Sequence, residues 1–255
     1  MKKFFGIMLA AMILFSFSLA AAIELGSEGY IEVEGIVYPE GQSINEMRRI
    51  AVMDAYRQLS EQTNDIYVSV NSTVRNLRDL DDVINTKVEA VLHGAKVMSI
   101  KREKDGSFHA IVRLYTHGGA SSLSGAVLKE DIEIEDFPAP KFTNMVSGNY
   151  SGLIIDCRGK KLSTAIAPAI KSADGTEIYA YKNLGYETAV SKGIISYSTS
   201  INTGVERAGS LPLTVKAVSV SGNCDVVVSA EDADKILAAN KLTNFLSNCA
   251  VVLVR

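Results

Sequence analysis

Residues 30–59, YIEVEGIVYPEGQSINEMRRIAVMDAYRQL, join a strand pattern directly to a helix pattern. Apolar residues alternate with glutamates over residues 30–38, which is the period of a half-buried strand. Ser43 and Glu46 then have the spacing of a capping box, in which both side chains bind backbone N–H groups at a helix start. The helix that follows, ending near residue 62, has one apolar stripe: Ile44, Met47, Ala51, Ala55 and Leu59.

The rest of the N-terminal region continues this alternation of strands and helices. Residues 66–70 have strand periodicity, and residues 79–93 have an apolar helical face that stops at Gly94. Two further strands are joined by a turn at residues 104–106, and the second alternates over residues 108–114. The order strand, helix, strand, helix, strand, strand predicts an α+β domain with both helices on one face of a sheet.

Regular patterns stop after residue 117. Residues 118–149 contain a stretch rich in glycine and serine, an acidic run at residues 130–136, and two prolines close to residue 139. Such a composition is typical of connecting segments. We therefore predict a linker at residues 118–149, with one short paired segment at residues 132–134.

A second domain is predicted at residues 150–255. Its first strand, residues 152–156, is a continuous apolar run, which is typical of a strand covered on both faces. Further strands are expected at residues 166–171, 177–181, 213–220, 225–228 and 250–254, with helices at residues 186–192 and, capped by Ser229, up to about residue 240. The pattern predicts a mixed α/β domain, preceded by the linker, the α+β domain at residues 23–117 and a leader at residues 1–22.

The leader has the pattern of a cleavable secretory signal. Lys2 and Lys3 precede an uncharged apolar stretch at residues 4–17, which is shorter than the about 20 residues of a membrane-spanning helix. We place cleavage after Ala22; cleavage after Ala20 and an uncleaved membrane anchor are the alternatives. The signal predicts export to the periplasm through the general secretory route.

Composition limits the partners of the exported chain. Without the leader, 24 basic and 29 acidic residues give a net charge of about −5, whereas nucleic acids and anionic lipids bind basic surfaces. No later apolar stretch is long enough to span a membrane, and residues 18–24 lack the cysteine that carries a lipoprotein's acyl chains. We expect a soluble mature protein that reaches the outer membrane only through partners.

The three cysteines, Cys157, Cys224 and Cys249, belong to the second domain. Cys224 and Cys249 each lie beside an apolar run, so neighbouring strands could bring them together in an oxidising compartment. This pair is the candidate disulfide. Three free thiols are the alternative.

The sequence contains no metal, phosphate or cofactor pattern. His93 ends a predicted helix, and His109 and His117 are eight residues apart on a strand, too far to share a metal at about 3.3 Å per residue. The aspartates within residues 79–82 lie at a helix start, where carboxylates complement the helix dipole. HExxH, CxxC and a glycine-rich phosphate loop are all missing, so we expect neither a metal nor a cofactor.

Asp156 and Cys157 are the strongest candidates for catalysis because they follow a buried strand. Cys157 lacks an activating histidine, since the second domain contains none. For Asp156 we favour a structural ion pair with Arg158, or a hydrogen bond to a turn, over catalysis. No catalytic residue is therefore assigned.

The first domain resembles the LPP-twenty lipoproteins and, in the same region, the flagellar proteins FlgP and FlgT. The resemblance is carried by the glycine-containing strand with Gly35, the helix cap, and the Arg-x-x-Ala-x-x-x-Ala spacing of Arg48, Ala51 and Ala55. Residues 150–159 (YSGLIIDCRG) and 229–241 (SAEDADKILAANK) are similar to a C-terminal module associated with such proteins in Gram-negative bacteria. This sequence departs from the family in lacking the lipid-bearing cysteine.

The resemblance implies a non-enzymatic envelope protein that acts by protein–protein contact, assembling or stabilising the flagellar basal body near the outer membrane. Envelope or flagellar proteins, and further copies of the chain, are the expected partners. The alternative is a periplasmic module for a small ligand or glycan, contacted by Tyr150, Tyr179 and Tyr181, although these tyrosines also suit a core or rim position. An enzyme using Asp156 and Cys157 is the third hypothesis.

Overall fold

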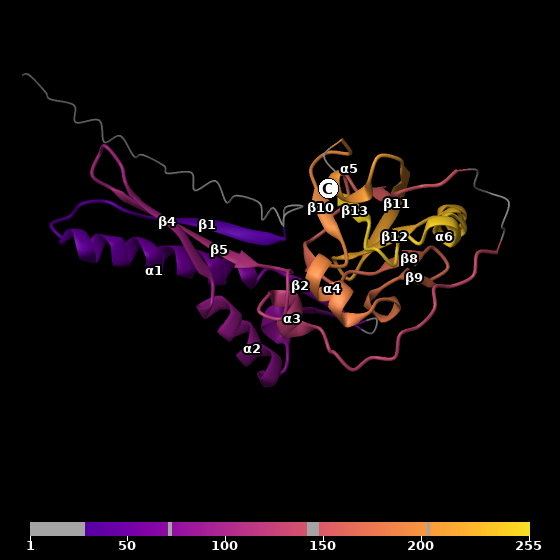
Figure 1. Ribbon diagram of the computed structural model, residues 1–255, viewed down its shortest axis with the longest axis horizontal. Helices are drawn as coiled ribbons and strands as arrows, with labels where there is room; N and C mark the ends of the chain where they lie inside the picture. Colours follow the sequence, from indigo (N-terminus) through magenta and orange to yellow (C-terminus); the bar gives the residue numbers. More distant parts are fainter. Residues whose placement is uncertain (1–28, 71–72, 142–147, 203–204) are drawn as a thin grey trace, which may run out of the picture.

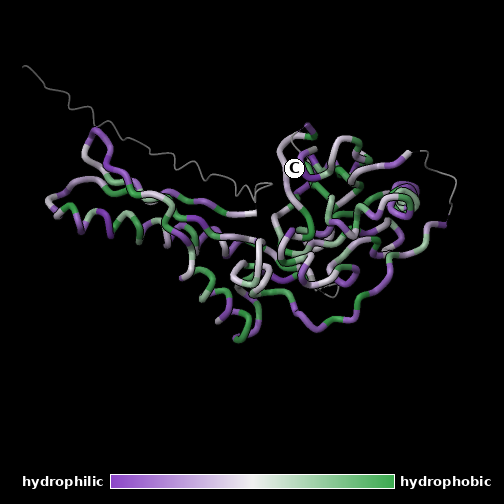
Figure 2. The backbone as a smooth tube through the Cα atoms, in the orientation of Figure 1, coloured by the Kyte–Doolittle hydropathy of each residue, from purple (hydrophilic) through white to green (hydrophobic). Residues whose placement is uncertain are grey.

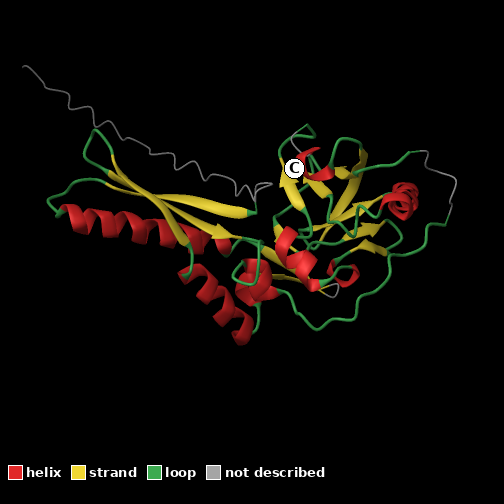
Figure 3. Ribbon diagram, in the orientation of Figure 1, coloured by secondary structure: helices red, strands yellow, loops and turns green. Residues whose placement is uncertain are grey.

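A computed structural model describes residues 29–70, 73–141, 148–202 and 205–255 (Figure 1). The leader at residues 1–22 and its cleavage site at Ala22 lie outside the described residues. The chain is a mixed α/β protein with six α-helices and three sheets in the part described, and two units of structure are visible (Figure 3). We call them the arm, made of α1, β1, β4 and β5, and the body, residues 150–255.

The arm is built from the strand and helix that residues 30–59 predict. β1 (Tyr30–Val37), β5 (Phe108–Tyr115) and β4 (Lys96–Arg102) form an antiparallel sheet in the order β1-β5-β4, and α1 (Ile44–Thr63) packs along it. Ser43 caps α1, its Oγ accepting a hydrogen bond from the N–H of Glu46. A Cβ atom at Gly35 would lie 2.1 Å from the carbonyl oxygen of Ala51, so only glycine permits this close approach of strand and helix.

The second predicted strand does not join the arm. β2 (Tyr67–Val70) pairs with β3 (Thr73–Asn76) and, in parallel, with β7 (Ala165–Ile166), so it connects the N-terminal region to the body. The period of a strand shows which face is buried, but not which edge receives its hydrogen bonds.

The second predicted helix begins later and is less buried than its apolar face predicts. Residues 77–79 form a short 3₁₀ turn, and α2 (Asp82–His93) starts after Asp81, whose carboxylate accepts a hydrogen bond from the N–H of Ile84. Only Val88 of α2 is buried, while the side chain of Val83 is 68% exposed. α2 packs against the short helix α3 (Leu123–Val127).

α3 corrects the prediction of a linker at residues 118–149. Leu123, Ala126, Val127 and Leu128 are buried, so the first part of this segment belongs to the core. A helix of five residues is too short to show a helical period in the sequence. The predicted paired segment at residues 132–134 forms no strand.

The body contains a seven-stranded sheet in the order β10-β13-β6-β11-β12-β8-β9. Its strands are β6 (Gly152–Asp156), β8 (Ile170–Ser172), β9 (Glu177–Tyr179), β10 (Ser196–Ser198), β11 (Pro212–Ser221), β12 (Asp225–Val228) and β13 (Val251–Val254). Its helices are α4 (Tyr186–Lys192), α5 (Val205–Ala208) and α6 (Ala230–Thr243), with a 3₁₀ turn at residues 181–183. In Figure 2 the hydrophobic strands lie inside the body.

Most predicted elements of the body are present, and β13 pairs inside the sheet as expected, between β10 and β6. The strand predicted at residues 166–171 is divided into β7 and β8, because Ala167 has a positive φ of 61° that ends the extended conformation. β10 and α5 were not predicted, since each has only three or four residues.

Candidate functional site

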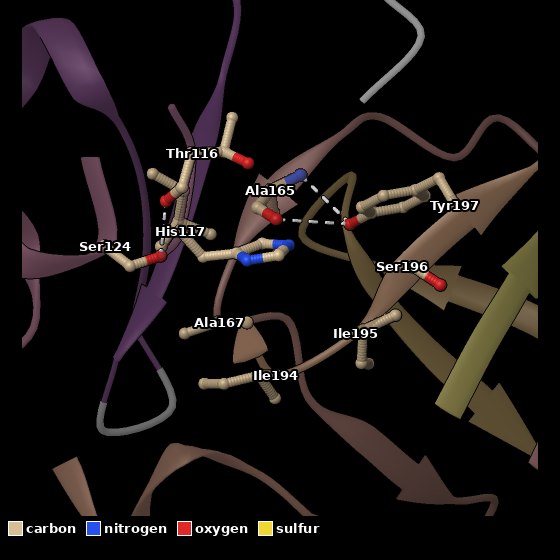
Figure 4. Close-up of a pocket in the computed structure, with 11 residues that line it drawn as sticks. Thr116, His117, Ser124, Ala165, Ala167, Ile194, Ile195, Ser196 and Tyr197 are labelled. Atoms are coloured by element: carbon tan, nitrogen blue, oxygen red, sulfur yellow. Dashed lines mark hydrogen bonds between the residues drawn. The ribbon is translucent and has the colours of Figure 1, made fainter. Parts of the chain in front are cut away.

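Residues 113–126, from the end of β5 through α3, separate two cavities. On one side lies a groove of about 620 Å³, bounded by α2, the start of β4 and α3. On the other side lies a cavity of about 30 Å³ between the N-terminal region and the body (Figure 4). We call them the basic groove and the junction cavity.

The basic groove combines a floor of buried apolar residues with cationic side chains. Its floor includes the buried residues Ala95, Leu114 and Ala126, and its charged residues are Lys87, Lys96 and Arg113. Its volume lies in the range of small-molecule sites, about 300–1,000 Å³. An anionic headgroup attached to an apolar chain fits this combination.

The cations of the groove differ in how firmly they are held. Arg113 pairs with Glu32 at 2.7 Å and lies 3.7 Å from the centre of the Tyr30 ring. The hydrogen bond that Arg113 donates to Glu32 raises the pKa of Arg113 above its ordinary value. The Nζ atom of Lys96 lies 5.4 Å from the centre of the Tyr115 ring, a weaker cation–π contact. Lys87 and Lys96 are therefore better placed than Arg113 to receive an anion.

His117 dominates the junction cavity. Its ring fills the space beside two glycines: a Cβ at Gly29 or Gly193 would lie 2.2 Å or 2.5 Å from a ring carbon. Nδ1 lies 3.3 Å from the carbonyl oxygen of Ser191, to which it donates when it carries the proton; in the neutral ring Nε2 is then unprotonated. Burial, and to a lesser degree the charge of Arg207, lower the pKa of His117.

Arg207 holds the backbone beside His117 in place. Its guanidinium donates to the carbonyl oxygens of Cys249 at 2.7 Å and Lys192 at 2.8 Å, and also to that of Gly193. Burial lowers the pKa of Arg207. Sequence reasoning missed this residue, because its short helix α5 has no pattern of its own.

The junction cavity has the size of a water molecule rather than of a substrate. The Tyr197 hydroxyl accepts a hydrogen bond from the N–H of Ala165 at 3.0 Å, and burial raises the pKa of this phenol (Figure 4). The Oγ atom of Ser196 is buried without a hydrogen-bond partner among the described residues. Tyr197 and Ala165 both belong to the body, whereas His117 reaches from the N-terminal region to Ser191 of the body, which is a structural role.

The candidate pair for catalysis is engaged in structural contacts. Asp156 accepts hydrogen bonds from the Arg158 guanidinium at 2.7 and 2.8 Å, which lower its pKa to about 2 and confirm the expected ion pair. Cys157 is fully buried, and burial raises the pKa of its thiol to about 12. A thiol with such a pKa is a poor nucleophile near neutral pH.

The proposed disulfide between Cys224 and Cys249 is not formed; both are buried free thiols, as is Cys157. Cys224 precedes β12 and Cys249 precedes β13, and β6 and β11 lie between these two strands. Because β12 is antiparallel to β11 whereas β13, β6 and β11 are parallel, the two strands start at opposite ends of the sheet. Three inter-strand steps of about 4.8 Å exceed the about 4.4–6.8 Å between the Cα atoms of a disulfide.

The histidines occupy separate places. His93 is the last residue of α2, and His109 binds Glu34 at 2.9 Å, far from the contacts of His117. Within the part of the chain that the structure describes, no three His, Cys, Asp or Glu side chains gather as metal ligands. Asp81 caps α2, as carboxylates at a helix start do.

The tyrosines proposed as ligand contacts are mostly inaccessible. Tyr179 is fully buried and donates to the carbonyl oxygen of Ile194 at 2.7 Å. Tyr181 is 3% exposed and donates to the carbonyl oxygen of Lys129. These two side chains cannot form a surface for sugar rings, so this part of the hypothesis is wrong.

A buried ion pair in the body was also missed from the sequence. The Asp225 side chain is fully buried, pairs with Lys171 at 2.8 Å and accepts a hydrogen bond from the N–H of Ala169 at 2.9 Å. The two residues come from neighbouring strands, β12 and β8, that are more than 50 positions apart in the chain. No local pattern links them.

The match to a known family covers the body of the protein. Residues 152–255 match the family model described as Treponema pallidum Tp0624, second domain. The match begins with β6 and reaches the end of the chain, so it covers the body and less than half of the sequence. No curated protein matches the chain. Among the helices described, none has both the length and the apolar character that a membrane span requires.

Proposed function

We propose that this protein is a non-enzymatic component of the bacterial envelope, exported to the periplasm, that acts by protein–protein contact. Its proposed role is the assembly or stabilisation of the flagellar basal body near the outer membrane. The leader pattern of residues 1–22 supports export. The ion pair of Asp156 with Arg158 and the complete burial of Cys157 support a role other than catalysis.

The observation that carries this proposal is the arm. It projects from the body, and its three-stranded sheet has an outer edge on β1 and another on β4 (Figure 1). On β1, the N–H of Ile36 and the carbonyl oxygen of Glu34 bind side chains of α1, whereas β4 pairs with no second strand among the described residues. Free strand edges present backbone N–H and C=O groups that add strands from partners. An extended arm with a free edge on β4 is suited to contacts between proteins.

The resemblance to the LPP-twenty lipoproteins, FlgP and FlgT supports the flagellar part of the proposal. Its spacing residues Ala51 and Ala55 are fully buried and pack where Gly35 brings β1 close to α1. The motif therefore serves the fold of the arm. The match of residues 152–255 to the second domain of Tp0624 concerns the body and leaves this part a proposal.

The test is cross-linking in the native bacterium followed by capture of the tagged protein. The variant Val97→Lys with Met98→Lys changes two side chains of β4 that are 43% and 46% exposed. Leu211→Lys with Leu242→Lys, at 54% and 59% exposed positions of the body, is the matched control. We expect the β4 variant alone to lose the cross-linked species and to impair swimming or envelope integrity. Normal swimming and an intact envelope in a deletion strain would contradict the proposal.

The basic groove favours a second candidate function, the binding of a small anionic amphiphile. Lys87 and Lys96 would hold the anion, and the buried apolar residues of the floor would contact the apolar chain. We expect dodecyl phosphate, but not the neutral sugar amphiphile dodecyl maltoside, to raise the melting temperature. Lys87→Gln with Lys96→Gln should abolish this shift, and Lys160→Gln with Lys161→Gln should preserve it. Equal shifts with both amphiphiles would contradict an anion site.

A further inference from the structure

β4 is a basic and exposed strand at the edge of the arm. It has three cations and no anion in seven residues, Lys96 to Arg102, and among the described residues it pairs with β5 on one side only. The side chains of Val97 and Met98 are 43% and 46% exposed. Lysines at a strand edge prevent pairing with a second basic edge by repulsion, but they favour an acidic strand. The charge of β4 therefore selects the chemistry of its partner.

A segment with the complementary chemistry lies at residues 130–136, EDIEIED, which we call the acidic segment. It has five carboxylates and no cation, and its carboxylate side chains are exposed. Ile132 and Ile134 alternate with these carboxylates in the period of a strand, yet the segment pairs with no strand in the described part of the chain. The side chain of Ile134 is 58% exposed.

The acidic segment is held on the body at its C-terminal end. The N–H of Glu135 donates to the carbonyl oxygen of Lys182 at 2.8 Å, and the Lys182 ammonium lies 3.0 Å from the Glu135 carboxylate. Asn183 donates to the carbonyl oxygen of Glu135 at 3.2 Å. Ile132 is half-buried against the core, whereas Asp131, Glu133 and Ile134 are exposed. A segment ordered in advance loses less conformational entropy when it binds.

β4 belongs to the arm, whereas the acidic segment is held on the body by Lys182 and Asn183 (Figure 1). β4 runs towards the tip of the arm, whereas the acidic segment follows α3 and runs along the body. In this arrangement β4 and the acidic segment of one chain do not pair with each other. Each copy offers one basic edge and one acidic segment, which is the arrangement of a head-to-tail contact.

We infer that the free edge of β4 is a docking site for the acidic segment of a second copy of this chain. The contact pairs Lys96, Lys101 and Arg102 with Glu130, Asp131 and Glu133, and it brings Ile134 to Val97 and Met98. Repetition of this contact closes a ring or extends a filament, depending on the rotation between copies. The inference rests on the proposed function, to which it adds the identity of one partner.

The experiment uses the mature chain, residues 23–255, in sedimentation velocity at low and high salt. We expect assemblies at low salt that dissociate at high salt, because ion pairs at an exposed contact are screened. An edge variant, Lys96→Glu with Lys101→Glu and Arg102→Glu, should be monomeric. A segment variant, Glu130→Lys with Asp131→Lys and Glu133→Lys, should be monomeric too. Glu135 is retained because it pairs with Lys182.

The edge variant and the segment variant reverse opposite charges, so a mixture of the two tests whether assembly depends on charge. A mixture of the edge variant and the segment variant should assemble again, since each acidic edge then meets a basic segment. The matched control, Lys160→Glu with Lys161→Glu and Lys241→Glu, makes the same charge change on exposed residues of the body and should assemble like the wild type. Circular dichroism and the melting temperature show that each variant is folded.

Two outcomes overturn the inference: a wild-type chain that stays monomeric at low salt, and assemblies that the edge variant leaves intact. As a second measurement, Val97→Cys and Ile134→Cys proteins should form a disulfide when mixed, and Val218→Cys in place of Val97→Cys should not. Val218 is 50% exposed on β11. A monomeric chain that still captures envelope partners would contradict this inference alone. Charge-dependent assembly in a bacterium that swims normally without the protein would contradict the proposed function alone.

Discussion

The arm and the body bury their strands to very different degrees. All but the last residue of β6 is buried, and the strand has a parallel neighbour on each side, β13 and β11. In β4, by contrast, five of seven residues are exposed, and β5 is its only partner strand in the described part of the chain. A strand enclosed on both faces and both edges contributes to stability, whereas a strand with a free edge is available to a partner. We therefore expect stability to reside in the body and contact in the arm.

The largest effect is expected from the buried ion pair of the body. Lys171→Met leaves the fully buried Asp225 carboxylate without its cation. Breaking a buried pair in this way costs about 3–5 kcal/mol of unfolding free energy, because a charge remains buried without compensation. Urea denaturation measures this loss. The double variant Lys171→Met with Asp225→Leu should recover part of it, and a double variant as unstable as the single one would contradict the explanation.

A smaller loss of unfolding free energy is expected at Gly35, where β1 packs closely against α1. Gly35→Val places side-chain atoms against the backbone of α1, where a Cβ would lie 2.1 Å from the Ala51 carbonyl oxygen. Overpacking costs about 1–3 kcal/mol. Hydrogen exchange should show faster opening of α1 and β1, with the amides of the body unchanged.

Val97→Ala is the control for the arm, since its side chain is 43% exposed on β4. It should change the unfolding free energy by less than about 0.5 kcal/mol. A loss at Val97 as large as the loss at Gly35 would mean that the edge of β4 is part of the core.

Two helix caps allow the stability of the arm and of the body to be compared at similar sites. Ser43 caps α1 in the arm and Ser229 caps α6 in the body, each accepting a hydrogen bond from the N–H three residues later. Replacement of either serine by alanine should cost about 1 kcal/mol. Thermal denaturation of Ser43→Ala and Ser229→Ala tests this expectation. No measurable loss at either site would show that these caps do not limit stability.

The junction between the two regions should respond to pH. The pKa of His117 is lowered by burial, so the unfolded chain, with a histidine pKa of about 6.5, binds this proton more readily than the folded chain. The stability that the neutral ring contributes is present above pH about 6.5 and is lost as the pH falls below it. His117→Gln should flatten the change in melting temperature between pH 7.5 and about pH 5.5. An unchanged slope in this variant would exclude His117 as its source.

Local elements were predictable to the extent that short-range patterns define them. β1, α1, β5, β6, α4 and α6 have clear periods or caps, and the structure contains them close to the expected bounds. α3 and β10 are too short for a period, and Ala167 interrupts a strand through its backbone angle alone. Pairing partners were the least predictable feature: β2 joins β7, and Cys224 is separated from Cys249.

The candidate site was less predictable than the fold. Sequence analysis correctly paired Asp156 with Arg158, because the two residues are neighbours in the chain. It missed the basic groove, whose residues come from α2, β4, β5 and α3, and it missed Arg207 at the junction. The acidic segment was recognised as an acidic run, but its attachment to the body through Lys182 follows only from the fold.

The sequence by itself determined the leader pattern, the strand and helix of the arm, and the buried strand that starts the body. Hydrophobic periods and caps act within about one helical turn or a few strand residues, so they can be read from neighbouring positions. Only the tertiary structure decided that the edge of β4 remains free and that Cys224 and Cys249 are too far apart for a disulfide. It also decided where the basic strand β4 and the acidic segment lie on the molecule. Those features depend on hydrogen bonds and packing between residues that are distant in the chain, and no local pattern encodes them.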